Sequence, residues 1–413
     1  MLNDGVINIV HLHVLYSGYK TGIDRYLEMY AQGVNGMNEY RKIHVHSVFF
    51  TDDKKILFPR INMSENGEII AIVPFPQNDV LLFKSSFWKN GYEKVVINLL
   101  QPYLRNKLNL IYQCHNLFLT DLAKELKAKL EGKIIIHLHC IPWKFKSLNN
   151  ILMFNKLYNL YQNKEYEAFG IEENGKINYN DADKIICLSQ AAKDYLLNVQ
   201  KIEGHKIEII PNGLQVRTGV MKRKLRRKNT ILYVGKVSKD KGIFELLESL
   251  LEVQRLGFCF KLVIAGTCSP IVWKKIQLKY SSIDIEYLGQ VTFDVLQELY
   301  STCVMGVIPS LHEQCSYVAL EMACFGMPMI VAEVDALAEM FEHGKTALLV
   351  PYIFDLDFGL SANRDVFVGN VIKLLKNQKL RTRLSENVRL LYEQRFGLDA
   401  MMKQMFTVYQ QLI

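Results

Sequence analysis

Short apolar runs that alternate with amphipathic helical patterns limit the fold of this sequence more than any other feature. Six such runs precede residue 211 and four follow it. They span residues 7–13, 43–50, 109–113, 133–138, 184–188 and 206–210, and then 230–236, 260–266, 283–289 and 303–309. Strands that alternate with helices form parallel sheets, and strands buried on both faces are continuously apolar. We therefore expect an α/β fold built on parallel sheets.

The alternation is interrupted once, by a basic stretch, and we interpret this interruption as a domain boundary. The chain has 413 residues, which is more than one hydrophobic core usually serves. We predict an N-terminal Rossmann-like domain over 1–214, an interdomain linker over 215–228 and a second Rossmann-like domain over 229–395. A C-terminal helix over 396–413 is expected to pack back on the first domain.

Two local patterns add to this outline. A turn signal around Gly67 predicts a hairpin within residues 58–77, inserted in the first domain. From about Leu380 onward, apolar residues recur at helical spacing and predict two terminal helices. Neither pattern by itself indicates a catalytic or binding site.

The composition is that of an ordinary folded protein. Hydrophobic residues make up 49% and charged residues 22%, without low-complexity tracts. The eight cysteines form no CxxC pair and are expected to be reduced thiols. No apolar stretch approaches the roughly 20 residues of a membrane-spanning helix, and the first residues lack a basic leader. We expect a cytoplasmic protein.

Basic side chains gather in one short stretch, MKRKLRRK at 221–228, although the net charge of +8 is modest. Residues 222–228 could contact an anionic membrane, at about 1 kcal/mol per basic residue, which would place the protein at the inner membrane face. More often such a run is a solvated linker. Nucleic acid is excluded as a partner because the basic residues are not interleaved with aromatic ones.

The most specific motif is PSLHEQCSYVALEMACFGMPMIVAEVDALAEMFEHGKTALLV, residues 309–350. It places Glu313 and Glu321 around the start of a helix that follows a strand. This pattern resembles the core of glycosyltransferase family 4 (glycosyl transferases group 1) and its retaining relatives, in which a Glu, seven residues and a second Glu open such a helix. A short motif recurs by chance, but a match of this length does not.

The resemblance implies a GT-B fold, in which two Rossmann-like, doubly wound parallel-sheet domains face a central cleft. It places Glu313 beside the donor sugar as a catalytic residue and Glu321 at the ribose. The free N–H groups and positive dipole end of the helix suit a diphosphate. The residues that present this end are Cys315, Ser316, Tyr317 and Val318. Many relatives have Gly-Phe-Gly after the first Glu, where this chain has Gln-Cys-Ser.

A second motif, YVGKVSKDKGIFELLESL at 233–250, places Lys236 and Lys241 between a strand and a helix. Without a further motif, two lysines near the start of a helix are more often solvent-exposed surface residues than ligands of a phosphate. In the family, basic residues at both positions contact the donor diphosphate and neutralise the charge that grows on the leaving group.

Two positions in the first domain also match the family. Gly22, preceded by Thr21, corresponds to a glycine whose backbone approaches the diphosphate or the acceptor, although the GxGxxG dinucleotide fingerprint is absent. His139, at the end of a predicted strand and followed by Pro142, corresponds to a histidine that faces the donor sugar. An imidazole there can hydrogen-bond a sugar hydroxyl.

A rival interpretation concerns the histidines around His139. His137 and His139 would share one face of a strand, and zinc accepts imidazole and thiolate ligands. The rival set consists of Cys114, His115, His137, His139 and Cys140. Its spacings match no common zinc pattern, and enzymes of GT-B type generally handle the diphosphate without a catalytic metal. We expect no metal and no cofactor.

The sequence as a whole is typical of a retaining glycosyltransferase that moves a hexose-type sugar from a nucleotide-sugar to a hydroxyl acceptor. UDP is the default nucleotide and GDP the next. The acceptor can be a glycan, a lipid-linked precursor, a small molecule or a peptide. Two alternatives stay open, namely a catalytically idle sugar-binding or scaffold protein and another GT-B enzyme such as an epimerase or a phosphorylase.

Overall fold

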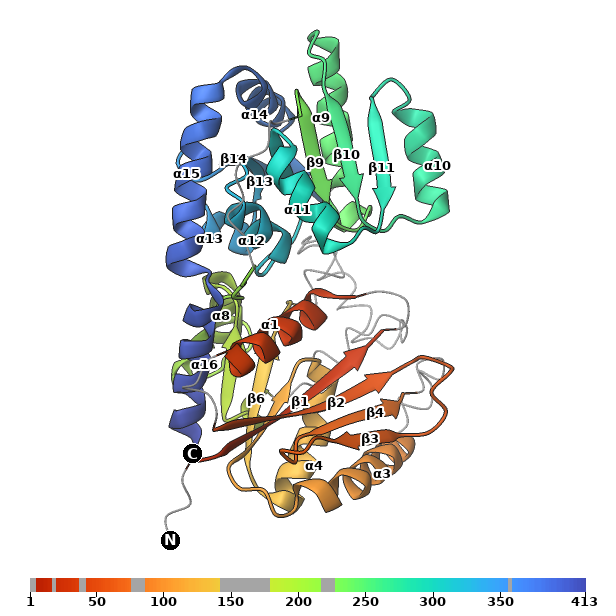
Figure 1. Cartoon of the computed structure of the whole chain (residues 1–413), viewed down its shortest axis with the longest axis vertical. Coiled ribbons are helices and arrows are strands. Elements are labelled where there is room, and N and C mark those ends of the chain that lie inside the picture. Colours follow the sequence, from red (N-terminus) through yellow and green to blue (C-terminus); the bar gives the residue numbers. More distant parts are fainter. Residues whose placement is uncertain are drawn as a thin grey trace. The chain divides into compact units, whose positions relative to one another are not determined.

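The computed structural model describes residues 5–16, 20–36, 42–75, 86–141, 179–216, 227–355 and 359–413. The chain forms two compact units (Figure 1). Unit 1 contains the described residues up to His139, those from 179 to Gly213, and Leu398–Ile413. Unit 2 consists mainly of Leu214–Gly397. Most of the predicted linker and of its basic stretch, as well as Pro142, lies outside the described residues.

Unit 1 is built on an eight-stranded sheet. Its strands are β1 (Ile7–Leu15), β2 (Ile43–Thr51), β3 (Arg60–Met63), β4 (Ile69–Pro74), β5 (Leu110–Cys114), β6 (Lys133–Leu138), β7 (Lys184–Cys187) and β8 (Ile207–Ile209). The strand order is β3-β4-β2-β1-β5-β6-β7-β8, and every pair is parallel except β3 with β4. This sheet confirms the expected doubly wound α/β fold, in which the chain reverses its direction of winding at β1 and β5.

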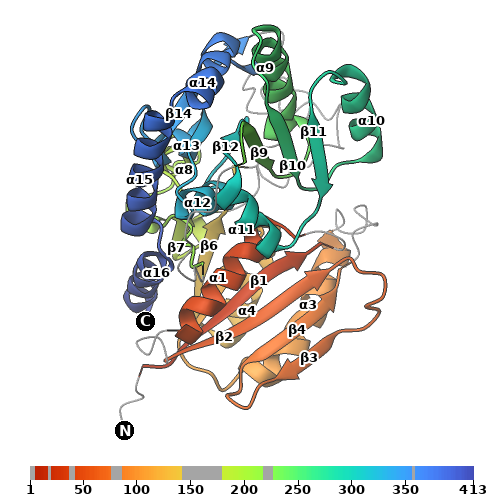
Figure 2. The same ribbon diagram turned by 45° about the horizontal axis from the view of Figure 1, so that its top comes forward.

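Helices lie on both faces of this sheet. They are α1 (Gly22–Gly36), α3 (Ser86–Leu104), α4 (Thr120–Leu130), α8 (Gln190–Asn198) and α16 (Leu398–Leu412). Helices α3 and α4 lie on the face opposite to α1 (Figures 1 and 2). Helix α8 begins at the predicted cap, Ser189, whose hydroxyl accepts a hydrogen bond from the backbone N–H of Ala192. The side chain thereby satisfies one of the free donors of the helix start.

The C-terminal helix α16 packs on α1 and on the strands of unit 1. The Tyr409 hydroxyl donates to Oε1 of Gln113 at 2.8 Å. Helix α1 passes close to α16 at Gly33, where a Cβ would lie 2.5 Å from the side chain of Met402. A residue larger than glycine would therefore force the Met402 side chain or the helices to shift.

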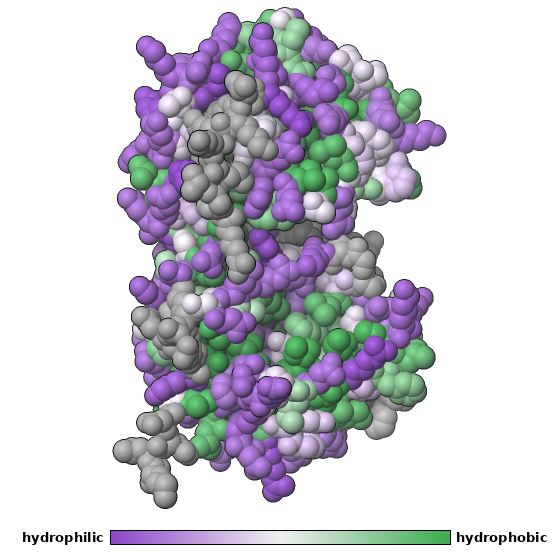
Figure 3. Space-filling model, in the orientation of Figure 1, coloured by the Kyte–Doolittle hydropathy of each residue, from purple (hydrophilic) through white to green (hydrophobic). Residues whose placement is uncertain are grey.

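The predicted hairpin is present as β3 and β4, paired antiparallel with Met63 opposite Ile69. Hydrophobic residues gather on the visible face of unit 1 over this region (Figure 3). Met63 is 64% exposed, and Leu57, in the loop before β3, is 73% exposed.

Unit 2 is built on a seven-stranded sheet. Its strands are β9 (Thr230–Val234), β10 (Lys261–Ala265), β11 (Ile285–Gly289), β12 (Met305–Ile308), β13 (Met329–Glu333), β14 (Leu348–Asp355) and β15 (Gly359–Ala362), in the order β11-β10-β9-β12-β13-β14-β15. All pairs are parallel except β14 with β15. The second parallel sheet is thus also confirmed.

The helices of unit 2 are α9 (Ile243–Arg255), α10 (Pro270–Lys279), α11 (Phe293–Thr302), α12 (Tyr317–Cys324), α13 (Asp335–Met340), α14 (Arg364–Lys376) and α15 (Gln378–Arg395). Helix α9 buries Leu246, Leu247 and Leu250 in a core that it shares with β9 and β10. Apolar positions at this helical spacing make a face that is buried against the sheet. The two predicted terminal helices are α15 and α16.

Two features bear on the class of protein. Among the described residues, none of the helices combines the length and the apolar character needed to cross a bilayer. All eight cysteines fall within the described ranges and none is in a disulfide, as the sequence predicted.

Candidate active site

The loops that follow β9 and β12 meet at the carboxyl edge of the unit 2 sheet. Gly242, in the turn before α9, has a φ of +65°, and a Cβ at this position would lie 1.8 Å from the carbonyl oxygen of Pro309. Only glycine combines this backbone conformation with so close an approach. The backbone N–H of Leu311 donates to the carbonyl of Asp240 at 2.9 Å and joins the two loops. Two motifs with 58 residues between them, 251–308, therefore lie side by side.

This contact brings Lys241 to Glu313. Their Nζ and Oε1 atoms are 2.5 Å apart, and the Ser310 hydroxyl donates to the same oxygen at 3.1 Å. The Lys241 side chain is 33% exposed and the Glu313 side chain 14%. The pair is thus partly shielded from water but can still be reached by a ligand. The lysine and the glutamate that the sequence analysis identified are therefore in direct contact.

The electrostatics of this pair keep the lysine charged. Burial alone would lower the pKa of Lys241, but the charge and hydrogen bond of Glu313, with the charge of Asp240, raise it above its usual value. A lysine held protonated beside a carboxylate offers three donors in a compact charge. Such a group suits the oxygens of a phosphate.

The N-terminus of α12 lies three residues after Glu313. The Ser316 hydroxyl accepts a hydrogen bond from the backbone N–H of Ala319 at 3.3 Å and caps the helix. Cys315, Ser316 and Tyr317 are buried, whereas Val318 is half-buried. The cap fixes the direction of the helix start, where the remaining N–H groups and the positive dipole end favour an anion.

Glu321 lies one turn further into α12 and is buried, with 7% of its surface exposed. Its Oε2 accepts a hydrogen bond of 2.8 Å from the hydroxyl of Tyr300 on α11. A buried carboxylate needs such donors, and this one holds the side chain in a single orientation. Sequence reasoning did not predict the role of Tyr300.

A histidine–aspartate pair borders Glu313 and was also missed. Nδ1 of His312 lies 2.5 Å from Oδ2 of Asp335, and both side chains are buried. Asp335 has a φ of +40°, a conformation that few residues other than glycine adopt, and the adjacent N–H of Ala336 donates to the Glu313 carbonyl. The pair therefore anchors the backbone of Glu313. His312 stands directly before Glu313 in the sequence, but nothing there reveals its partner.

Lys236 lies in the same loop after β9 as Lys241. It follows Gly235 at the end of β9 and its side chain is exposed. The Tyr233 hydroxyl donates to its carbonyl at 2.7 Å and fixes the backbone of the loop. The backbone of Lys236 is therefore held in place, whereas its side chain is exposed to solvent.

In unit 1, Gly22 begins α1, and space within the described residues is open where its Cβ would stand. Thr21 and Asp24 cap this helix reciprocally: the Thr21 hydroxyl donates to Oδ2 of Asp24 at 2.7 Å and accepts from the Asp24 N–H at 3.3 Å. Burial alone would raise the pKa of Asp24, but hydrogen bonds from His13 and Thr21 lower it. A carboxylate therefore already uses part of the anion-binding capacity of this helix end.

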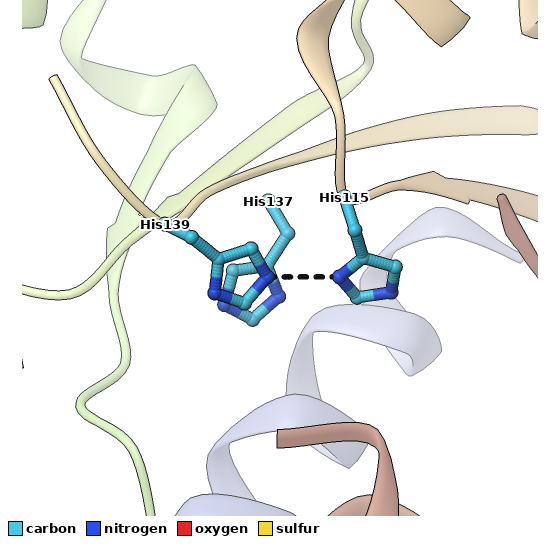
Figure 4. A group of neighbouring side chains, drawn as sticks. All are labelled: His115, His137 and His139. Atoms are coloured by element: carbon cyan, nitrogen blue, oxygen red, sulfur yellow. Dashed lines mark hydrogen bonds between the residues drawn. The ribbon is translucent and has the colours of Figure 1, made fainter. Parts of the chain in front are cut away.

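His139 directly follows β6 and joins a group of histidines from neighbouring strands (Figure 4). Its Nε2 lies 2.9 Å from Nδ1 of His115, and its ring stacks on His137 with centroids 4.2 Å apart. The structure thus brings together three members of the rival zinc set. Cys114, another member, donates its thiol to the Leu119 carbonyl instead, at 3.7 Å.

Two family models match this chain. The model described as Glycosyltransferase Family 4 matches residues 34–217, and the model described as Glycosyl transferases group 1 matches residues 228–358. The two matches together cover well over half of the chain. This protein belongs to the family 4, group 1 glycosyltransferases.

Curated relatives of this family 4 glycosyltransferase are distant. Alpha-D-kanosaminyltransferase of Streptomyces kanamyceticus is 26% identical over 184 residues, which are 44% of this chain and 45% of the relative. The capsular polysaccharide biosynthesis glycosyltransferase CapM of Staphylococcus aureus is 23% identical over 248 residues, 55% of this chain and 61% of the relative. The chain thus spans less than two thirds of the length of these relatives.

Solved structures show the same fold along nearly the whole chain. Sucrose-phosphate synthase from Thermosynechococcus elongatus has a TM-score of 0.69 at 15% identity, over 98% of this chain and 99% of that one. The Anabaena protein HepE, solved with UDP and glucose, has a TM-score of 0.67 at 14% identity, over 98% and 100%. This family 4 glycosyltransferase therefore has the GT-B fold that its sequence predicted.

Proposed function

We propose that this protein is a retaining glycosyltransferase that moves a hexose-type sugar from a nucleoside-diphosphate sugar to a hydroxyl acceptor. The observation that carries the proposal is the convergence of Lys241 and Glu313 just ahead of the capped start of α12. Family membership and the position of both side chains at the carboxyl edge of a parallel sheet support it, because ligands of such sheets bind at that edge.

Lys241 and the N-terminus of α12 are the groups that bind the donor diphosphate. Both supply positive charge without a metal, the first through its ammonium group and the second through backbone N–H groups. As the bond to the sugar breaks, negative charge grows on the leaving phosphate, and fixed donors stabilise that charge more than they stabilise the bound donor. Lys236, which is exposed, adds a second cation that a bound diphosphate can order.

Glu321 and Glu313 are assigned to the two ends of the donor. Glu321, held by Tyr300 through one oxygen, accepts hydrogen bonds from the ribose hydroxyls. Glu313 lies beside the donor sugar, where its charge stabilises an oxocarbenium-like transition state. A diphosphate that draws Lys241 away leaves the Glu313 carboxylate available to that sugar, so donor binding and activation are linked.

The configuration at the anomeric carbon is retained if the acceptor attacks this carbon from the face that the leaving group has just left. The anomeric carbon–oxygen bond breaks with its electron pair on the diphosphate, the acceptor oxygen bonds to the same carbon, and the acceptor proton passes to the leaving phosphate oxygen. Atoms and charges balance without a covalent enzyme intermediate. His139 and Gly22, in unit 1, are assigned to a sugar hydroxyl and to the backbone approach of the diphosphate or acceptor.

UDP is the nucleotide that we propose first, and GDP second. The structural neighbour HepE was solved with UDP and glucose, which supports the first choice. The capsular polysaccharide function named for CapM favours an acceptor in glycan or glycoconjugate synthesis. A lipid-linked precursor, a small molecule or a peptide is a further class of acceptor to be tested.

A donor screen tests the proposal. UDP-, GDP- and ADP-sugars are each tested for slow hydrolysis and for a rise in melting temperature, with the wild type, Lys241→Ala and the matched control Lys239→Ala, which removes an exposed lysine from the same turn. We expect one donor to stabilise and be cleaved by the wild type and the control but not by Lys241→Ala. Binding without hydrolysis or transfer to any acceptor would instead identify a sugar-binding scaffold, and no binding would remove the assignment of this site.

A further inference from the structure

The histidine group of unit 1 contains two buried rings, those of His115 and His137, to which the proposed donor chemistry assigns no role. His115, His137 and His139 each offer a ring nitrogen such that the three nitrogens lie within 4.8 Å of one another. The three residues come from the ends of the adjacent strands β5 and β6, and Figure 4 shows the stacked rings of His137 and His139 beside His115. His115 and His137 are buried and His139 is half-buried.

We propose that His115, His137 and His139 form a zinc site. Zinc binds imidazole nitrogens at about 2.0–2.1 Å, and tetrahedral ligands then lie about 3.4 Å apart. Nδ1 of His115 and Nε2 of His139 are already 2.9 Å apart. The rings of His137 and His139 are stacked with parallel planes, so the His137 ring must turn about its side-chain bonds before its nitrogen lone pair points at a metal shared with the other two. The proposal does not depend on the glycosyltransferase activity.

An unpartnered buried nitrogen is the second observation. Nε2 of His137 has no hydrogen-bond partner within the part of the chain that the structure describes. Its other nitrogen, Nδ1, faces Nε2 of Gln113 at 3.0 Å. If the Gln113 amide nitrogen donates a hydrogen bond to Nδ1 of His137, Nδ1 carries no proton. The proton of the neutral His137 ring then lies on Nε2, where a buried N–H without an acceptor costs free energy.

A half-turn of the Gln113 amide removes this cost and prepares a metal ligand. The amide oxygen and nitrogen then exchange places, a change of little steric consequence. The oxygen accepts from Nδ1–H of His137, and the nitrogen donates to the Tyr409 hydroxyl, which now lies 2.8 Å from the oxygen. Nε2 of His137 is left with a free electron pair, which is the form that zinc binds.

His11 plays the corresponding part for His115. Its Nδ1 lies 2.8 Å from Nε2 of His115. With the His115 proton on Nε2, the ring donates to His11 and keeps Nδ1 bare for the metal. Partners that hold the second nitrogen of a ligating histidine fix its tautomer and orientation. His139, coordinated through Nε2, retains Nδ1–H for a hydrogen bond to a sugar hydroxyl.

The chemistry of the group selects the metal. A histidine binds a metal through the free electron pair of its neutral ring, and the three nitrogens of this group lie within 4.8 Å of one another. Three neutral imidazoles without a thiolate suit zinc or another divalent ion late in the first transition series. The nearby carboxylate of Asp24, 3.0 Å from His13, supplies negative charge on the same side of the sheet.

Zinc titration of the full chain tests the site. The protein is stripped with a chelator and titrated with zinc chloride, followed by calorimetry and elemental analysis. We expect one zinc per chain for the wild type and for His205→Gln, a matched substitution of an exposed histidine in the same unit. His137→Gln should bind at least about tenfold more weakly, and His11→Leu, which removes only the partner of His115, should lose roughly 10- to 100-fold.

Two results would overturn the proposal. The first is a stripped wild type that takes up no zinc, or zinc affinity that is equal in the wild type and in His137→Gln. The second is a thiolate charge-transfer band in the cobalt-substituted protein, which would assign the metal to Cys114 or Cys140. Circular dichroism of each metal-free variant separates lost binding from lost folding, and a wild-type donor screen without activity leaves the zinc result unaffected.

Discussion

The two units differ in the charge of the side chains at the carboxyl edges of their sheets, which are charged in unit 2 and neutral in unit 1. In unit 2, a cation and a carboxylate, Lys241 and Glu313, lie 2.5 Å apart where β9 and β12 end. In unit 1, histidines whose pKa is lowered by burial gather on β1 and at the ends of β5 and β6. We propose that the first edge binds a charged phosphate and that the second binds neutral hydrogen-bonding groups or a metal. The same topology supports both because side chains, rather than the fold, determine what each edge binds.

The comparison predicts that unit 1 is the acid-sensitive one, through His46. The N–H of Ile69 donates to Nδ1 of this buried ring, and Nε2 faces Oδ1 of Asn8 at 3.1 Å, so the neutral form is the one that fits. Burial, with the charges of Lys107 and His44, lowers its pKa from 6.5 to about 3. Because the unfolded chain takes up a proton near pH 6.5 and the folded one near pH 3, stability falls as the pH drops through this window, by up to about 5 kcal/mol.

Hydrogen exchange of the metal-free protein between pH 7 and pH 4, followed by mass spectrometry, measures this effect unit by unit. Unit 1 should lose protection first. His46→Gln, whose amide can both accept from Ile69 and donate to Asn8, should flatten the pH dependence, whereas His205→Gln should not. Equal loss of protection in both units would contradict the comparison.

The next largest effect is expected in catalysis, from Glu313→Gln. This change keeps an acceptor for Ser310 but removes the negative charge that pairs with Lys241 and that we propose stabilises the transition state at the donor sugar. Loss of one preorganised electrostatic group lowers kcat by roughly 10²- to 10³-fold. Initial rates with the donor found in the screen measure it, and Glu333→Gln, an exposed carboxylate at the end of β13, is the control. An unchanged kcat would show that Glu313 serves structure alone.

A third prediction concerns the close contact that assembles the unit 2 site. Gly242→Ala combines backbone strain with a Cβ 1.8 Å from the Pro309 oxygen and should destabilise unit 2 by roughly 3 kcal/mol. Gly257→Ala, at a φ of +84° with open space around it in the described residues, carries the strain without the clash and should cost about 1 kcal/mol. Urea denaturation compares the two. Similar losses would mean that the loops separate without difficulty.

The smallest effect is expected at the cap of α12. Ser316→Ala removes the acceptor for the Ala319 N–H and should cost about 1 kcal/mol of stability. Thermal denaturation measures the loss, and Ser282→Ala, an exposed serine of unit 2, is the comparison. A loss of donor affinity larger than the loss of stability would show that the diphosphate uses the helix end that this cap orients.

The fold was largely predictable because continuous apolar runs mark buried parallel strands. Ten strands and the terminal helices follow from local periodicity, and the hairpin follows from its turn signal, whereas β13, β14 and β15 were not predicted. The approach of Lys241 to Glu313 was accessible only through the family resemblance, because strand order is not visible in a single sequence. The partners Tyr300 and Asp335 were missed for the same reason. Both lie on segments that meet their site only after folding, and neither forms a motif with it.

The return of the last residues to unit 1 has a consequence for how the protein is made. Synthesis proceeds from the N-terminus, and Gln113 receives its Tyr409 partner only after the whole of Leu214–Gly397 has been produced. The unit that is begun first is therefore finished last. Until then helix α1 and strand β5 lack their contacts with α16. A nascent chain thus carries an incomplete first unit together with a second unit whose residues are all present.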